Sequence, residues 1–147
     1  MRVVIQRSLK SDVKIDHKIV GSIEHGLVIL VGFTYDDEIS DIEYIVNKII
    51  NLRIFNDDNG IMNKSLLETN GSILSISQFT LYADIKKGRR PSYVAALEPT
   101  KAIVLYDMFN QSLINKGIKV ATGIFGADMQ VNINNDGPVT IVMESRN

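Results

Sequence analysis

The chain has 147 residues, of which 45% are hydrophobic and 22% are charged, and its formal net charge at pH 7 is −1. This length predicts a single domain over residues 1–147 with a sizeable buried core. The near-neutral charge argues against a protein that coats nucleic acid by bulk electrostatic attraction, although it leaves room for a local basic patch. The sequence has no cysteine and no apolar run of membrane-spanning length, so we expect a cytoplasmic protein without a membrane segment.

The first third of the chain predicts four strands and one helix. Val- and Ile-rich segments at Arg2–Ser8, Asp12–Asp16 and Lys18–Ile23 predict strands, and a turn joins the last two into a hairpin. The continuous apolar run Leu27–Phe33 predicts a strand that is covered on both faces. Between residues 36 and 52, apolar residues recur every three or four positions, which predicts an amphipathic helix.

The middle of the chain contains a turn, a polar strand and a basic loop. Asn56–Gly60 is a strong turn signal. Ser72–Asp84 begins as a strand and changes character at Ser77, where hydroxyl and amide side chains stand beside aromatic rings. Polar groups in an apolar strand need partners, which neighbouring backbone or a ligand can supply. Lys86–Arg90 carries four positive charges within five positions, which fits either a solvated loop or phosphate contacts.

The last third predicts a second helix and three more strands. Pro99 suits the first turn of this helix, and Gly117 follows its end. The strands expected after it are Ile118–Thr122, Met129–Ile133 and Val139–Glu144. The whole pattern predicts an α+β fold with a mostly antiparallel sheet or barrel and two main helices packed against it.

Few side chains of the usual catalytic kinds are available. A Ser-His-Asp triad needs a histidine, and both histidines, His17 and His25, lie in the N-terminal hairpin region. Neither has the clustered carboxylates or cysteines that a metal site requires. Ser77 and Thr80 would need a base that the sequence does not reveal. Catalysis would therefore rest on hydroxyls, backbone amides or groups of the substrate, and we expect no metal or cofactor.

A set of short motifs resembles the D-aminoacyl-tRNA deacylase family over nearly the whole chain. One signature is Ser77-Gln-Phe-Thr-Leu81, and the other is Asn135-Asp-Gly-Pro-Val-Thr140. Further matching segments are Met1–Arg7, Leu52–Phe55, Gly60–Asn63, Ser65-Leu66, Gly88–Ser92 and Phe125–Met129. Each segment is short, but their order and spacing together are highly specific.

The resemblance implies a homodimeric editing hydrolase. Such an enzyme would cleave the ester that joins a D-amino acid to the terminal adenosine of tRNA, and would also remove glycine mischarged onto alanine tRNA. It implies tRNA as the partner, with no DNA. Gly137-Pro138 would form a cis peptide that reaches into the partner subunit's active site, where its carbonyls exclude the side chain of an L-amino acid. Arg7 would brace this loop.

The resemblance also implies the residues of the substrate pocket. Those expected to line the adenosine and aminoacyl pocket are Ser77, Gln78, Phe79, Thr80, Ala102, Phe125 and Met129. Thr80 could act as a nucleophile, or the ribose 2′-hydroxyl could activate water while the enzyme positions the substrate. We favour the second mechanism, because no base accompanies Thr80. Candidates for phosphate contacts, if the basic loop is not simply solvated, are Lys86, Lys87, Arg89 and Arg90.

Two other functions stay open on the residues alone. The first is a non-catalytic module that binds an RNA acceptor end through the basic loop and through stacking on Phe79 and Tyr82. The second is an esterase of small substrates with Ser77 or Thr80 as the nucleophile, against which the lack of a suitably placed histidine weighs.

Overall fold

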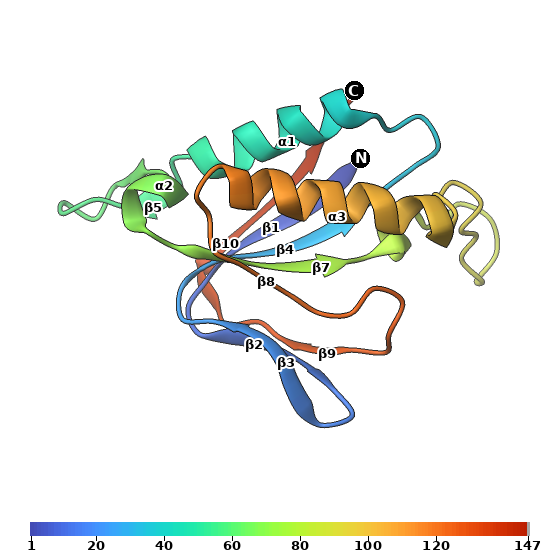
Figure 1. Ribbon diagram of the computed structural model, residues 1–147, viewed down its shortest axis with the longest axis horizontal. Coiled ribbons are helices and arrows are strands. Elements are labelled where there is room, and N and C mark those ends of the chain that lie inside the picture. Colours follow the sequence, from blue (N-terminus) through green and yellow to red (C-terminus); the bar gives the residue numbers. More distant parts are fainter. Residues whose placement is uncertain (147) are drawn as a thin grey trace.

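The computed structural model describes residues 1–146. Its centre is a five-stranded sheet with the strand order β10-β1-β4-β7-β8 (Figure 1). These strands are β1 (Arg2–Ser8), β4 (Gly26–Gly32), β7 (Ser72–Ser77), β8 (Val120–Thr122) and β10 (Asn135–Glu144). β1 pairs antiparallel with both β10 and β4, whereas β4, β7 and β8 run parallel to one another.

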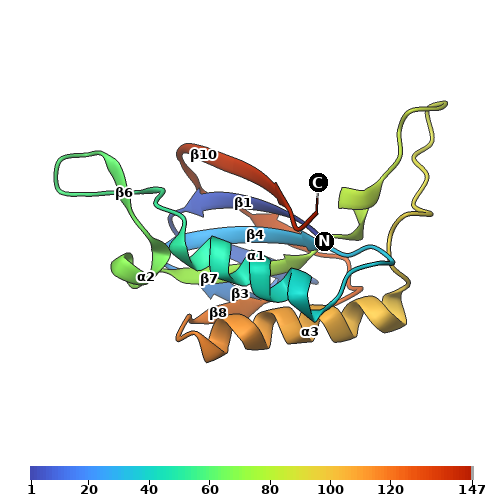
Figure 2. The same ribbon diagram turned by 90° about the horizontal axis from the view of Figure 1, so that it is seen from above.

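The two long helices cover one face of this sheet, and a smaller sheet lies against the other. The helices α1 (Ile39–Asn51) and α3 (Pro99–Asn115) lie side by side over the central strands (Figures 1 and 2). The smaller antiparallel sheet has the order β3-β2-β9. Its strands are β2 (Ser11–Ile15), β3 (Lys18–Ile23) and β9 (Gln130–Asn132).

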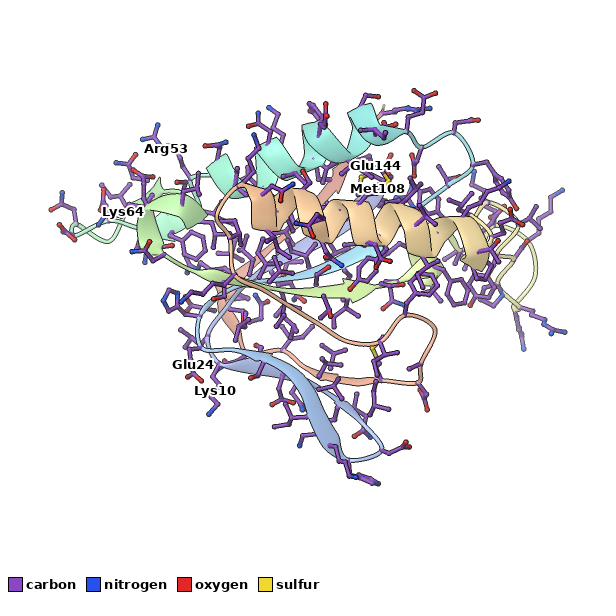
Figure 3. All side chains as sticks on the ribbon, in the orientation of Figure 1. Lys10, Glu24, Arg53, Lys64, Met108 and Glu144 are labelled. Atoms are coloured by element: carbon purple, nitrogen blue, oxygen red, sulfur yellow. The ribbon has the colours of Figure 1, made fainter. Side chains whose placement is uncertain are left out.

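Three short elements project from the ends of the central sheet. A hairpin of β5 (Phe55–Asn56) and β6 (Met62–Lys64) leads into the one-turn helix α2 (Leu66–Thr69). Arg53 and Lys64 mark this end of the molecule in Figure 3. A 3₁₀ turn, η1 (Phe79–Tyr82), follows β7 at the opposite end.

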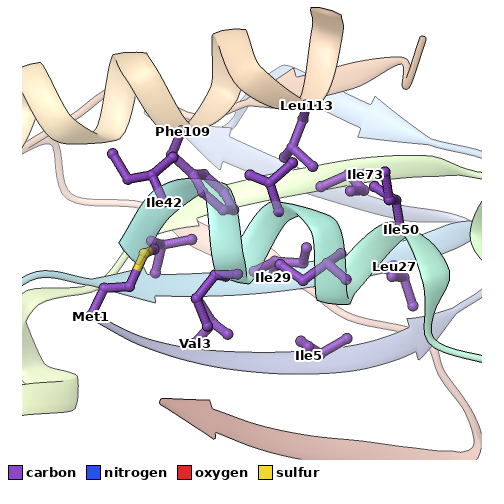
Figure 4. Packing of buried hydrophobic residues seen from close by; sticks show 14 of the residues in the cluster. Met1, Val3, Ile5, Leu27, Ile29, Ile42, Ile50, Ile73, Phe109 and Leu113 are labelled. Atoms are coloured by element: carbon purple, nitrogen blue, oxygen red, sulfur yellow. The ribbon is translucent and has the colours of Figure 1, made fainter. Parts of the chain in front are cut away.

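The main core fills the space between the sheet and the helices. β1 turns every second side chain toward the helices, so that Val3 and Ile5 are fully buried beneath α1 (Figure 4). Phe109 and Leu113 reach the same core from α3. Period-two burial on the strand and helical spacing on α3 thus meet in one apolar layer. Among the described residues, no helix is both long and apolar enough to cross a membrane.

Most of the predicted elements are confirmed. β1 and β3 have the expected bounds, and both long helices form where their periodicity places them. The prediction of mostly antiparallel pairing is also correct, although the described chain forms open sheets and no closed barrel. The hairpin turn at residues 56–60 is present, but β6 and α2 were not predicted.

Several strand boundaries differ from the prediction by one or two residues, and two are wrong by four residues or more. The strand expected over Ser72–Asp84 ends at Ser77, because the chain leaves the sheet once the Gln78 N–H has bonded to the carbonyl of Val31 at 2.7 Å. β10 begins at Asn135 instead of Val139, because Asn135 pairs with Ser8 across a register shift. Both corrections come from contacts between distant segments.

A buried carboxylate predicts how stability depends on pH. Asp41 accepts hydrogen bonds from the Glu38 N–H at 2.9 Å and from the Arg146 guanidinium at 2.5 Å. Arg146 holds the pKa of this carboxyl well below its ordinary value. The ion pair therefore contributes stability above about pH 4, and that contribution is lost as pH falls toward the folded-state pKa. We expect Asp41→Asn to cost about 2 kcal/mol at pH 7 and clearly less at pH 2, measured by urea unfolding. An equal loss at both pH values would contradict this.

Candidate functional site

The site is built at the carboxyl ends of two parallel strands. β4 and β7 pair in register up to Val31 and Ser77, and the chain then turns into η1. Side chains that follow such strand ends gather at one edge of the sheet, which is where open α/β sheets bind ligands. The polar residues that end β7 therefore stand at the floor of a pocket.

A pocket of about 540 Å³ opens at this edge. Its floor comes from the ends of β4 and β7, and its walls come from the start of α3 and the loop between β8 and β9. Lining residues include Ser77, Gln78, Phe79, Tyr93, Pro99, Ala102, Phe125, Asp128 and Met129. This volume and this mixture of apolar walls with a few polar groups are typical of sites for small molecules.

The structure brings together six of the seven residues expected in the pocket. Those that line it are Ser77, Gln78, Phe79, Ala102, Phe125 and Met129. Thr80 is the exception, since it lies beside the lining residues, and its hydroxyl accepts a hydrogen bond from Gln78 Nε2 at 2.5 Å. Thr80 therefore holds the Gln78 side chain in place, which a sequence motif by itself does not reveal.

The aromatic residues pair differently from the expectation. Phe79 is exposed and meets Tyr93 edge-on, with 5.1 Å between the ring centroids. The Arg2 guanidinium instead lies over the Tyr82 ring, with 4.9 Å between the guanidinium carbon and the ring centroid. Burial raises the pKa of Tyr82 to about 12. The structure therefore pairs Phe79 with Tyr93, whereas Tyr82, the second stacking residue expected from the sequence, lies against Arg2.

Two carboxylates line the pocket that were not expected from the sequence. Glu98 immediately precedes α3 and forms an ion pair with Lys101 at 2.9 Å. Asp128 belongs to the loop that supplies Phe125 and Met129. Its place within the Phe125–Met129 motif is the signal that could have identified it. These are the acidic groups that a mechanism based on a protein base would have to use.

Gly137-Pro138 lies far from the pocket of its own chain. The loop packs beside Arg7, and Arg7 pairs with Leu27 at the start of β4. The pocket lies at the other end of β4. Strand spacings place the two regions on the order of 20 Å apart. The peptide bond is cis, and both residues are exposed.

Arg7 links this loop to the neighbouring hairpin. The Arg7 side chain is buried, and its Nη1 donates to the carbonyl of Ile54 at 2.8 Å. Its Nε lies 3.1 Å from Asp136 Oδ2. Gly137 has φ +116°, and a Cβ atom there would come within 3.0 Å of Arg7 Nη2. Arg7 and the loop thus fit closely only while residue 137 is glycine.

The four basic residues lie in a loop beside the pocket. Backbone hydrogen bonds between Asp84 and Ser92, at 2.8 and 2.9 Å, close this loop, and Tyr93 of the pocket follows directly. All four basic side chains are exposed, and within residues 1–146 none forms an ion pair. They are Lys86, Lys87, Arg89 and Arg90. Their charge is therefore available to a ligand at the pocket mouth.

A family model and two similar proteins carry matching descriptions. A family model described as D-Tyr-tRNA(Tyr) deacylase matches residues 4–144. A protein of Geobacillus sp. (strain WCH70) named D-aminoacyl-tRNA deacylase is 51% identical over 146 residues, covering 99% of this chain and 96% of that one. A protein of Brevibacillus brevis with the same name is 52% identical, covering 99% of this chain and 100% of that one.

Two solved structures share the fold. One, titled c-Myc DNA Unwinding Element Binding Protein, has a TM-score of 0.92 and 36% identity, with 98% of each chain covered. Another, titled as a probable eukaryotic D-amino acid tRNA deacylase, has a TM-score of 0.84 and 20% identity, with 97% and 98% covered, and supports the fold alone. From the family match and the relatives at about half identity over their full lengths, the chain belongs to the D-Tyr-tRNA(Tyr) deacylase family.

Proposed function

We propose that the protein is an editing hydrolase that cleaves the ester of D-aminoacyl-tRNA, and of glycine mischarged onto alanine tRNA, in the pocket at the end of β7. The single observation that carries this proposal is the pocket itself. It gathers residues from β7, α3 and the β8–β9 loop that are far apart in the sequence, and those from the end of β7 and from the β8–β9 loop include members of two of the family's motifs. Family membership supplies the reaction class.

The pocket would hold the terminal adenosine and the aminoacyl group. Phe79 and Tyr93 offer aromatic faces for a base, and Ser77 and Gln78 offer hydrogen-bond donors and acceptors. Thr80 orients Gln78 and has neither a histidine nor an acid as a hydrogen-bond partner in the described structure. We therefore assign Ser77 and Thr80 to positioning, and the activation of water to the ribose 2′-hydroxyl.

The chiral gate would come from a second copy of the chain. Gly137-Pro138 cannot reach the pocket of its own chain, because the two regions lie at opposite ends of the sheet. A homodimer that places this exposed loop over the partner's pocket would use its backbone carbonyls to exclude L side chains. Selectivity would then need little contact with the D side chain, which allows many D-amino acids.

Chirality-dependent hydrolysis tests the proposed function. We expect release of D-tyrosine from D-tyrosyl-tRNA to exceed release of L-tyrosine from L-tyrosyl-tRNA by at least about a hundredfold, followed as loss of the labelled ester. Equal rates on the two substrates, or no hydrolysis of either, would contradict the proposal. Binding of the acceptor end without hydrolysis would instead favour the RNA-binding module.

The basic loop would contact phosphates of the acceptor stem. Replacing Lys86 and Lys87 with Gln should raise KM for the tRNA substrate several-fold and reduce its salt dependence, because fewer counterions are released on binding. Competition with an acceptor-stem RNA should inhibit hydrolysis, whereas the DNA duplex of the same sequence should not, since we take tRNA and not DNA as the partner. An unchanged salt slope in the double variant would show that Lys86 and Lys87 make no phosphate contacts.

A further inference from the structure

The pocket wall between β8 and β9 has little regular structure of its own. This wall segment, residues 123–129, carries Phe125, Asp128 and Met129 into the pocket. One internal backbone hydrogen bond, from the Ala127 N–H to the carbonyl of Ile124 at 3.2 Å, closes its turn. The Met129 sulfur fills the space in which a Cβ atom on Gly123 would stand, so the two ends of the segment are pinned together. Its middle needs another support.

Tyr106 supplies that support from α3. Its ring lies against Phe125, with 6.0 Å between the centroids and a tilt of 45°. Tyr106 stands one helical turn after Ala102, so one face of α3 contributes both a pocket-lining residue and the residue behind Phe125. The 6.0 Å separation lies within the range over which aromatic rings attract one another, so Tyr106 packs against Phe125 from behind.

The Tyr106 hydroxyl also ties α3 to the site strand. It donates a hydrogen bond to the carbonyl of Ser75 at 2.7 Å, in a fully buried setting. Ser75 precedes Ser77 of the pocket by two residues on β7. Burial raises the pKa of Tyr106, so the hydroxyl stays protonated at neutral pH and keeps donating. One side chain thus connects the floor of the pocket, its helical wall and Phe125.

We propose that Tyr106 is a positioning residue that holds Phe125 and thereby fixes the pocket wall for the reacting ester. Its effect on catalysis rests on the function proposed above. Misplacement of a substrate by about 1 Å can cost on the order of a hundredfold in rate. Because the ring makes the contact with Phe125, loss of the ring should matter more than loss of the hydroxyl.

The position of the wall can be measured without any substrate. Five methionines are present, and carbon-13 labelling makes each of their methyl groups an NMR probe at a known position. Tyr106→Leu should shift the Met129 signal, which reports on the wall segment, and leave the Met62 signal on the distant hairpin unchanged. Tyr106→Phe should shift Met129 less. If the chemical shift of Met129 is the same in Tyr106→Leu as in the wild type, the positioning role is wrong, whatever the protein hydrolyses.

Kinetics then test whether the position matters. On D-tyrosyl-tRNA, Tyr106→Leu should lower kcat/KM at least about tenfold, and Tyr106→Phe should stay within about threefold of the wild type. Combining Tyr106→Leu with Phe125→Leu should cost little more than the worse single change, because both act through one contact. If the losses in kcat/KM of the two single variants multiply in the double variant, the proposal is wrong. Tyr106→Met, which keeps more of the buried volume, takes the place of the Leu variant if that variant does not fold.

A neighbouring aromatic residue of the same helix provides the control. Phe109 is fully buried in the main core and does not line the pocket. Phe109→Leu should lower Tm at least as much as Tyr106→Leu and leave kcat/KM within about twofold. If the two variants lose kcat/KM equally, Tyr106 acts through general stability. If the wild type hydrolyses no aminoacyl-tRNA, the proposed function fails, and the Met129 signal still decides whether Tyr106 holds the wall.

Discussion

Replacing the 2′-hydroxyl of the terminal adenosine with hydrogen is expected to slow hydrolysis of a 3′-linked D-tyrosyl ester by about a hundredfold or more. The reason is that the pocket offers hydroxyls and amides at the end of β7 but no histidine in its lining. A group of the substrate that activates water would then supply the contribution that general bases make elsewhere. The rate of ester loss under single-turnover conditions measures the chemical step directly.

Thr80→Ala is the paired measurement on the protein side. Because the Thr80 hydroxyl accepts from Gln78 and lies beside the pocket lining, we expect this variant to keep turnover within about tenfold of the wild type. Asp128→Asn serves as the control for a protein base, since Asp128 lines the pocket. Normal cleavage of the deoxy substrate together with loss of activity in Thr80→Ala or Asp128→Asn would return the mechanism to a protein group.

Gly137→Ala should raise hydrolysis of L-tyrosyl-tRNA by at least about tenfold and leave hydrolysis of D-tyrosyl-tRNA within about threefold. Residue 137 has a positive φ that side chains rarely adopt, and the added Cβ would crowd Arg7 Nη2 and Val139 Cγ2 at 3.0 Å each. The strained backbone and these contacts should displace the loop, and a gate built from its carbonyls should then open. Initial rates on the two substrates give the ratio directly.

A glycine on the nearby hairpin separates gating from backbone strain. Gly60 also has a positive φ, of +75°, but a Cβ atom there would meet nothing within 4 Å. Gly60→Ala should thus also place an L residue at a positive φ, without crowding a neighbour, and leave the ratio of L to D hydrolysis unchanged. A Gly137→Ala enzyme that still rejects L-tyrosyl-tRNA as the wild type does would contradict the gating role.

Local patterns predicted the elements whose environment is uniform along their length. β1 and α3 were predicted correctly because one face of each contacts the same apolar core along its whole length. The strand from Ser72 was predicted too long. The Gln78 N–H donates a hydrogen bond to the carbonyl of Val31 in β4, and the periodicity of the sequence cannot predict that contact. The start of β10 at Asn135 depends on a distant partner in the same way.

The pocket could be predicted only in part. Motif resemblance identified Ala102, Phe125 and Met129, which no periodicity connects with Ser77. The resemblance could not predict the orientation of the Thr80 side chain, because that orientation depends on one hydrogen bond from Gln78. Glu98 was missed because an isolated carboxylate before a helix carries no signal until the fold brings it to a pocket. Asp128 was missed because only Phe125 and Met129 of its motif were assigned to the pocket.

Mixing two variants tests most directly whether the partner subunit's loop completes the site. Ala102→Phe should fill the pocket and abolish hydrolysis in its own subunit, while its Gly137 loop stays intact. Gly137→Ala keeps an open pocket and has a defective loop. When subunits are exchanged with a tenfold excess of Ala102→Phe, each working pocket should face an intact loop. The ratio of L- to D-tyrosyl-tRNA hydrolysis should then fall back toward the wild-type value. A ratio that stays as high as in Gly137→Ala alone would show that the loop does not act across the dimer.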